Sequence, residues 1–148
     1  MNLGTSGSKG FFITGSEIAY DLNRNYWSSG DKAFLNNYLK ALYTADNSGV
    51  YTITTTTSTT SPFSGLSSFT YSTNTASMYN VAYPDVIAPN TGAVLQLTYS
   101  GGQGACISYN GGYRLFYCGF PFETIDSSTS RNSLMSDALN FFGISPQR

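Results

Sequence analysis

The sequence predicts an α/β fold in which a mostly parallel sheet is extended by an antiparallel hairpin and covered by helices on both faces. Three observations predict it. The short apolar run at 11–14 lies between two glycines, which is typical of a buried parallel strand. Apolar residues recur at helical spacing over 31–43. Near the end, Asn-Gly-Gly at 110–112 separates two apolar segments, as in a β-hairpin.

The first half is expected to run strand, helix, helix, strand. The strand at 11–14 leads into a helical turn at 16–20, for which Ser16 is the expected N-cap. A longer helix is predicted over 31–43, and the turn residues Asp-Asn-Ser-Gly end it. The β-branched residues at 50–60 predict a strand that enters an exposed loop.

The second half is expected to be rich in β-structure and to end in a helix. The predicted strands lie at 69–71, 78–81, 93–99, 105–109 and 113–118. Ser127 or Ser128 caps the final helix, and Gly143 with Pro146 ends it.

Length and composition indicate a single α/β domain over residues 1–148, without repeats or linkers. Only 10% of the residues are charged and the net charge is -1, which excludes the basic surface that nucleic-acid binding requires. No apolar run is long enough to span a membrane. The aromatic share of 16% favours an extracellular or cell-surface domain, which requires an export signal that these residues do not contain.

Chemistry is expected where strands end and helices begin, at 14–17 and 118–123. Ser16 at a sharp strand-to-helix turn is similar to a nucleophile elbow, and Glu17 and Glu123 are the nearby carboxylates. However, the chain contains no histidine that could accept the proton of a serine. Ser16 is therefore a weak catalytic candidate, and capping a helix is its ordinary use.

Other side chains suggest binding. Glu17 and Asp21 share a helix face, where they either hold a cation or lie in solvent, and we expect no metal and no cofactor. Tyr20, Asp21, Trp27 and Asp85 are candidate binding residues, and the aromatic residues of the chain are numerous enough to line a glycan-binding face by stacking.

Two cysteines, Cys106 and Cys118, lie on opposite arms of the predicted hairpin. Counting outward from the turn offsets them by two or three positions, which makes a cross-strand disulfide awkward. Two buried free thiols are the expected state.

Three ordered segments resemble a class I glutamine amidotransferase-like domain found near the C-terminus of secreted, multidomain bacterial proteins. They are FFITGSEI at 11–18, YPDVI at 83–87 and RLFYCGFPFE at 114–123. This resemblance spans nearly the whole chain and implies a flavodoxin-like, mostly parallel sheet. It also implies that the chain is the C-terminal part of a larger domain or protein, or that a partner chain covers its first strand.

Active members of that superfamily carry a cysteine at the elbow and a His-Pro-Glu motif after a later strand. Matched residue by residue, Ser16 stands near the elbow position, Pro121 stands where the histidine would be, and Glu123 stands where the acid would be. The resemblance therefore implies an inherited fold without the inherited chemistry, which is a pseudoenzyme.

The leading functional prediction is a non-catalytic structural or interaction module of a secreted bacterial protein. Its expected partners are a second copy of the chain or other domains of the same precursor. A glycan-binding surface domain and a hydrolase with a degenerate site at Ser16, Glu17 and Glu123 are the alternatives.

Overall fold

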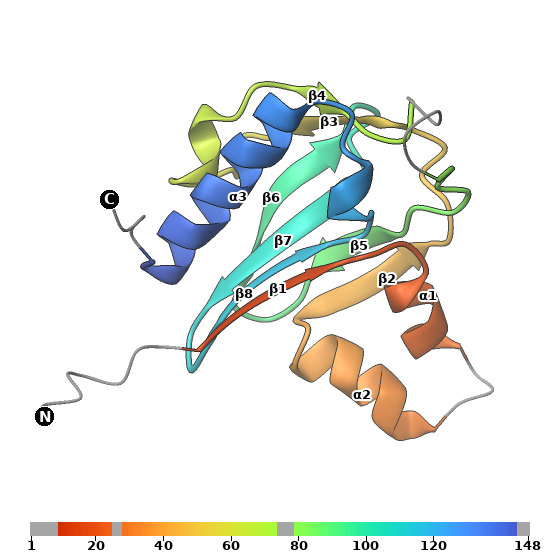
Figure 1. Ribbon diagram of the computed structural model, residues 1–148. Coiled ribbons are helices and arrows are strands. Elements are labelled where there is room, and N and C mark those ends of the chain that lie inside the picture. The colour runs from red at the N-terminus through yellow and green to blue at the C-terminus, as the bar shows by residue number, and fades with distance from the viewer. Residues whose placement is uncertain (1–8, 25–27, 74–78, 145–148) are drawn as a thin grey trace, which may run out of the picture.

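The structure is a computed structural model, and it describes residues 9–24, 28–73 and 79–144. Within them, a curled six-stranded sheet has helices on both faces, and a two-stranded sheet lies beside it (Figure 1). The strands are β1 Gly10–Thr14, β2 Ala41–Ala45, β3 Thr52–Thr55, β4 Phe69–Thr70, β5 Val86–Pro89, β6 Ala93–Tyr99, β7 Gly104–Asn110 and β8 Arg114–Cys118. The helices are α1 Ile18–Asn23, α2 Ser29–Asn37 and α3 Ser128–Phe142, with 3₁₀ turns η1 Phe63–Gly65 and η2 Phe122–Thr124.

The large sheet is mixed, with the strand order β1-β8-β7-β6-β3-β4. Among the described strands, only β1 and β8 pair in parallel. The prediction of a mostly parallel, flavodoxin-like sheet is therefore wrong. The physical reason is the length of the connections: β6, β7 and β8 follow one another through short turns, which join only antiparallel neighbours, whereas a parallel pair needs a long crossover.

The strongest local signals predicted their elements correctly. Strand β6 has the predicted bounds, and β7 and β8 flank the Asn-Gly-Gly turn. Helix α3 begins after Ser127, whose hydroxyl accepts a hydrogen bond from the Ser130 N–H, and ends at Gly143 with a φ of 77°. Residues 79–81 form no strand, and position 78 lies outside the described residues.

The helix predicted over 31–43 is wrong in its second half. Helix α2 stops at Asn37, Lys40 takes a left-handed φ of 55°, and the chain continues as β2. The cause is tertiary: β2 pairs with β5, and Ala41 is buried in the same cluster as Leu35 of α2. The apolar spacing was consistent with either structure, and strand pairing decided between them.

Two apolar clusters lie on opposite faces of the large sheet, and β8 contributes to both. Phe116 and Cys118 belong to the cluster under α3, whereas Leu115 and Tyr117 belong to the cluster under α1, α2 and β2. Successive side chains of a strand point to opposite faces, so a strand with helices on both sides is apolar throughout. This is why the four residues that follow Arg114 in β8, LFYC, are apolar and buried without alternation.

Strand β1 lies at one end of the large sheet, and no described strand pairs with its outer edge. Its hydrogen bonds to β8 can be followed from both ends, since Arg114 N–H donates to Lys9 C=O and Gly15 N–H donates to Cys118 C=O. In a parallel ladder this assigns the backbone groups of Phe11 and Ile13 to β8. The backbone groups of residues 10, 12 and 14 therefore point to the outer edge.

Strand β5 crosses β7 so closely that only a glycine fits at the crossing. A Cβ atom on Gly104 would lie 2.0 Å from the carbonyl oxygen of Ile87, a backbone atom that cannot turn aside. This contact sets the position of the β2–β5 pair against the large sheet.

We expect Gly104→Ala to lower the free energy of unfolding by about 3 kcal/mol, because the added methyl group forces β5 away from β7. Urea denaturation followed by tryptophan and tyrosine fluorescence measures the change. Gly65→Ala is the matched control, since nothing lies within 4 Å of its added Cβ. Equal stability of the two variants would contradict the close crossing.

Candidate functional site

The turn from β1 into α1 holds the predicted elbow, but its unusual residue is Glu17. Glu17 is the N-cap of α1 and has a left-handed φ of 68°, a conformation that a non-glycine residue rarely adopts. Ser16 lies one residue earlier and is not the cap, so the prediction that Ser16 caps this helix is wrong. The Glu17 side chain makes no capping hydrogen bond either.

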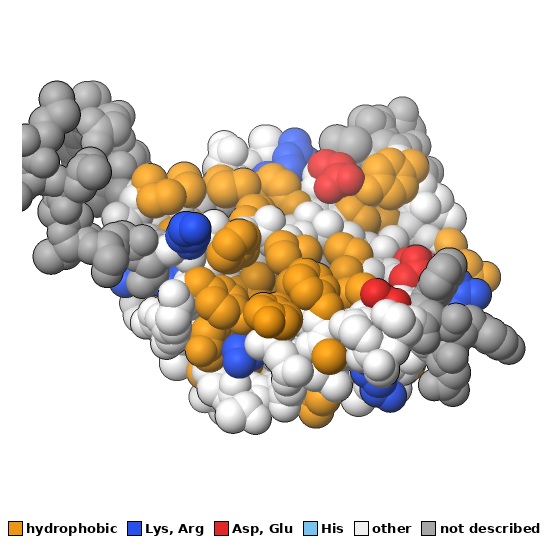
Figure 2. All heavy atoms as spheres, turned by 90° about the horizontal axis from the view of Figure 1, so that it is seen from below, with side chains coloured by type: hydrophobic (Ala, Val, Ile, Leu, Met, Phe, Trp, Pro, Cys, Tyr) orange, Lys and Arg blue, Asp and Glu red, His pale blue; other side chains and the backbone are white. Residues whose placement is uncertain are grey.

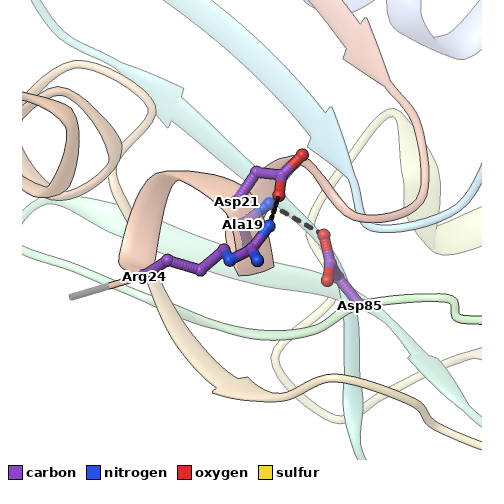
Figure 3. A network of polar contacts seen from close by, with 4 residues as sticks. All are labelled: Ala19, Asp21, Arg24 and Asp85. Carbon is purple, nitrogen blue, oxygen red and sulfur yellow. Dashed lines mark hydrogen bonds and ion pairs between the residues drawn. The ribbon is translucent and has the colours of Figure 1, made fainter. Parts of the chain in front are cut away.

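Asp85 supplies the missing cap from a distant part of the chain. Its Oδ2 accepts a hydrogen bond of 2.8 Å from the Ala19 N–H (Figure 3), and the backbone N–H of Tyr20 also lowers the pKa of this carboxyl group. A carboxylate at this end of a helix satisfies free N–H groups and interacts favourably with the helix dipole. Asp85 therefore has a structural role at the start of α1. The sequence indicated Asp85 as a binding candidate but did not predict this role.

Asp85 is completely buried, and this dominates its chemistry. Burial raises the pKa of its carboxyl from 3.8 to about 7, against the lowering effect of the two N–H donors. The other oxygen, Oδ1, has no hydrogen-bond partner in the described structure, and neither does the buried hydroxyl of Tyr117. The charge of Asp85 is in turn a main cause, after burial, of the raised pKa of Tyr117.

Two more carboxyl groups adjoin Asp85, and we call Glu17, Asp46 and Asp85 the acidic cluster. Burial and then the charge of Asp46 raise the pKa of Glu17. Glu17 therefore holds a proton more readily than an isolated carboxyl group would. No three potential ligands among the described residues are arranged to hold a metal ion.

Two of the remaining binding candidates, Tyr20 and Asp21, lie on α1. Asp21 is exposed and forms a 3.0 Å ion pair with Arg24 (Figure 3). The Arg24 guanidinium lies 5.1 Å from the centre of the Tyr20 ring. Trp27 lies outside the described residues. Asp21 therefore has a cation from its own helix as partner.

Glu123, the predicted acid, belongs to a different environment. It is exposed on η2, and its Oε1 accepts a hydrogen bond of 2.5 Å from the Tyr79 hydroxyl. Its charge is not among the main influences on Glu17 or Asp85. The structure therefore brings Glu17 and Asp85 together, and it places Glu123 in a separate environment.

The two cysteines are directly opposite each other in the β7–β8 ladder. The predicted offset of two or three positions is wrong, because the turn closes at 111–113 and the register pairs Cys106 with Cys118. Both are buried as thiols in the cluster under α3.

An aromatic face lies beside the outer edge of β1, formed by Phe11, Phe34, Tyr38, Tyr109 and Tyr113. Its rings are connected: Phe11 packs edge-on against Tyr113 at 5.9 Å, and Phe34 stacks on Tyr38 at 5.7 Å. The Tyr113 hydroxyl donates to the Tyr38 carbonyl, which joins the two pairs. Figure 2 shows hydrophobic side chains gathered over the face that points downward in Figure 1.

Much of this aromatic face is in solvent. Phe11 is 46% exposed, Phe34 47% and Tyr38 61%. Lys40 adds a positive charge at its border, 4.7 Å from the centre of the Tyr109 ring. Half-exposed aromatic side chains that touch one another are typical of a binding surface, whereas the apolar residues on an ordinary protein surface are scattered singly.

A groove of about 600 Å³ runs between α3 and the segment around η1. Its walls combine serine and threonine hydroxyl groups, Asn132 and Asp137 with apolar side chains such as Leu66, and burial raises the pKa of Asp137. The aromatic residue that lines it, Phe69, is only 6% exposed and offers no ring face on which a sugar could stack.

Comparison with protein-family models, with curated proteins and with solved structures gives no match. The functional argument therefore depends on the residues and their geometry. Within the described residues, no helix is long and apolar enough to cross a lipid bilayer.

Sequence reasoning missed Asp46, Tyr117 and the aromatic face. Asp46 follows β2 in a segment that reads as an ordinary turn, and Tyr117 reads as one more strand residue. Exposed aromatic residues have no sequence signature that separates them from core residues, because both occur at the same spacing.

The pKa of Asp85 predicts that stability falls as pH rises. The carboxyl group binds its proton more tightly in the folded protein than in the unfolded chain, so its contribution is complete below pH 4 and is lost as pH rises through about 7. We expect Asp85→Asn to flatten this dependence and to be more stable than the wild type at pH 8, by at most about 4 kcal/mol.

Urea denaturation at pH 5 and pH 8 measures this effect. Asp21→Asn is the control, because it removes the same charge from an exposed position on α1. Glu17 titrates in the same direction, so some pH dependence remains in Asp85→Asn. An undiminished loss of stability in Asp85→Asn between the two pH values would show that Asp85 is not the group responsible.

Proposed function

We propose that this chain is a non-catalytic interaction module whose partner is a second copy of the same chain, bound along the outer edge of β1. The observation that carries the proposal is the position of β1. It ends the large sheet among the described strands, and the aromatic face adjoins it. An edge strand with exposed apolar side chains is a template for pairing with another strand.

The edge is self-complementary. In an antiparallel pairing about a two-fold axis at Phe12, Gly10 of one copy lies opposite Thr14 of the other. Every outward-pointing N–H then meets an outward-pointing C=O, because residues 10, 12 and 14 face the same edge. The axis is perpendicular to the sheet, so the aromatic faces of both copies lie on the same side and become continuous.

A binding role is also consistent with the state of the acidic cluster. Asp85 is completely buried and its carboxylate caps helix α1, which supports a structural role for this group rather than contact with a substrate. The chain has no histidine that could take over proton transfer.

We expect the purified chain to dimerise as its concentration rises, with a mass twice that of the monomer in size-exclusion chromatography with light scattering. Phe11→Glu is expected to keep the monomer at all concentrations, because it places charge beside the paired strands. Tyr83→Glu is the matched control: it changes an aromatic residue that is 51% exposed and lies outside both β1 and the aromatic face.

Amide hydrogen exchange tests the geometry of the pairing. The N–H groups of Phe11 and Ile13 bond to β8 in either state, so their protection is expected to stay constant. The N–H groups of Phe12 and Thr14 are expected to become protected only in the dimer. A strictly monomeric chain, or dimerisation without this alternating protection, would refute edge pairing through β1.

Glycan binding is the second candidate function, and the stacked, half-exposed pair Phe34 and Tyr38 favours it. Binding of the chain to a glycan array is expected to be lost in Tyr38→Ala and retained in Tyr83→Ala. An array without any bound glycan would count against this function and would leave the dimer proposal unaffected.

A further inference from the structure

The β7–β8 ladder holds two nucleophilic groups that the proposed function does not use. We propose that Cys106 and Cys118 form a cross-strand disulfide that closes while the chain folds, and that the finished fold then shields both sulfur atoms from thiol reagents. The disulfide is a covalent modification of the core and is independent of any contact at β1.

The backbone geometry is suitable for this bond. Cys106 is paired with Cys118, and the next pair is joined by a 2.9 Å hydrogen bond from the Gly119 N–H to the Ala105 C=O. Hydrogen-bonded and non-hydrogen-bonded pairs alternate along an antiparallel ladder, so the two cysteines form a non-hydrogen-bonded pair. The Cys118 carbonyl confirms this, because it accepts from Gly15 of β1 on the other side.

A non-hydrogen-bonded pair is the closer of the two kinds, with Cα atoms about 4.5 Å apart. Disulfides connect residues whose Cα atoms are about 4.4–6.8 Å apart. Residues directly opposite each other also project their side chains to the same face of the sheet, and both cysteines belong to the cluster under α3. The bond can therefore form without movement of the strands.

The burial of the two cysteines determines at which stage of folding the disulfide can form. Neither cysteine has any exposed surface, and α3 with its apolar residues covers them. Burial and the neighbouring Cys118 raise the pKa of the Cys106 thiol, which removes the thiolate that exchange requires. The same environment that makes the reduced folded protein unreactive also protects the disulfide once it has closed.

The reaction requires an oxidant, for which we name a small-molecule disulfide such as glutathione disulfide. In the unfolded or partly folded chain, one cysteine thiolate attacks the reagent, which forms a mixed disulfide and releases one glutathione thiolate. The second cysteine thiolate then attacks the protein sulfur of the mixed disulfide and releases the other. Two protein thiols are oxidised by two electrons, and one reagent disulfide is reduced to two thiols.

The test exposes the full chain to the same oxidant in two states, folded and refolding. Fully reduced protein is either kept folded with glutathione disulfide, or unfolded in urea and refolded with the same reagent. We expect two free thiols after the first treatment and none after the second, counted by alkylation under denaturing conditions. Trypsin cleaves after Arg114, between the cysteines, so the disulfide links two tryptic peptides that mass spectrometry can identify.

Closure is also expected to raise the melting temperature of the refolded protein by about 5–10 °C over that of the reduced protein. This comparison needs no substitution and so does not depend on a variant that folds. Cys118→Ala is the matched control: it is expected to gain only a removable glutathione adduct and to show no such rise.

Three outcomes would overturn the proposal. They are refolded protein that retains both thiols or forms only intermolecular disulfides, oxidised protein that melts below the reduced protein, and folded reduced protein that is oxidised as fast as the unfolded chain. None of these outcomes depends on the oligomeric state, so the failure of this proposal and the failure of dimerisation through β1 are distinguishable.

Discussion

The structure depends on the way in which three segments meet at Asp85. Its N–H donates to the Gly119 carbonyl at the end of β8, its carbonyl accepts from the buried hydroxyl of Tyr99 in β6, and its carboxylate caps α1. These bonds hold the end of β8 and the start of α1 against one another. Gly119 leaves room for this, because a Cβ there would lie 2.4 Å from the Asp85 carbonyl oxygen.

The groups at this junction contribute to the fold, whereas the groups that a partner could contact lie on another part of the surface. A carboxylate that caps a helix out of contact with water orders the fold, but a substrate cannot reach it without opening the junction. The surface that is accessible lies elsewhere, where β1 ends the sheet and Phe11 and Tyr38 stand in solvent. The physical contrast between a closed polar centre and an open apolar face is the basis for proposing that the chain is an interaction module.

Local signals in the sequence were sufficient for the hairpin and the last helix. Asn-Gly-Gly permits a tight turn, and the serine before α3 and the glycine after it satisfy the helix ends, so both elements are determined within a few residues. The residues 38–43 could not be assigned in this way, because Leu39 and Tyr43 are apolar at a spacing that suits a helix as well as a strand. The register of Cys106 and Cys118 also depended on where the turn closes, which the three turn residues alone leave open.

The sequence by itself determined which residues are apolar, that a hairpin and then a helix follow one another in the last third of the chain, and that imidazole chemistry is absent. The directions of the strands, the pairing of β1 with β8 and the burial of Asp85 were decided only by tertiary structure. The reason is that strand order and the environment of a carboxylate depend on contacts between residues far apart in the chain, such as Asp85 with Ala19, and such contacts leave no periodic signal in either segment.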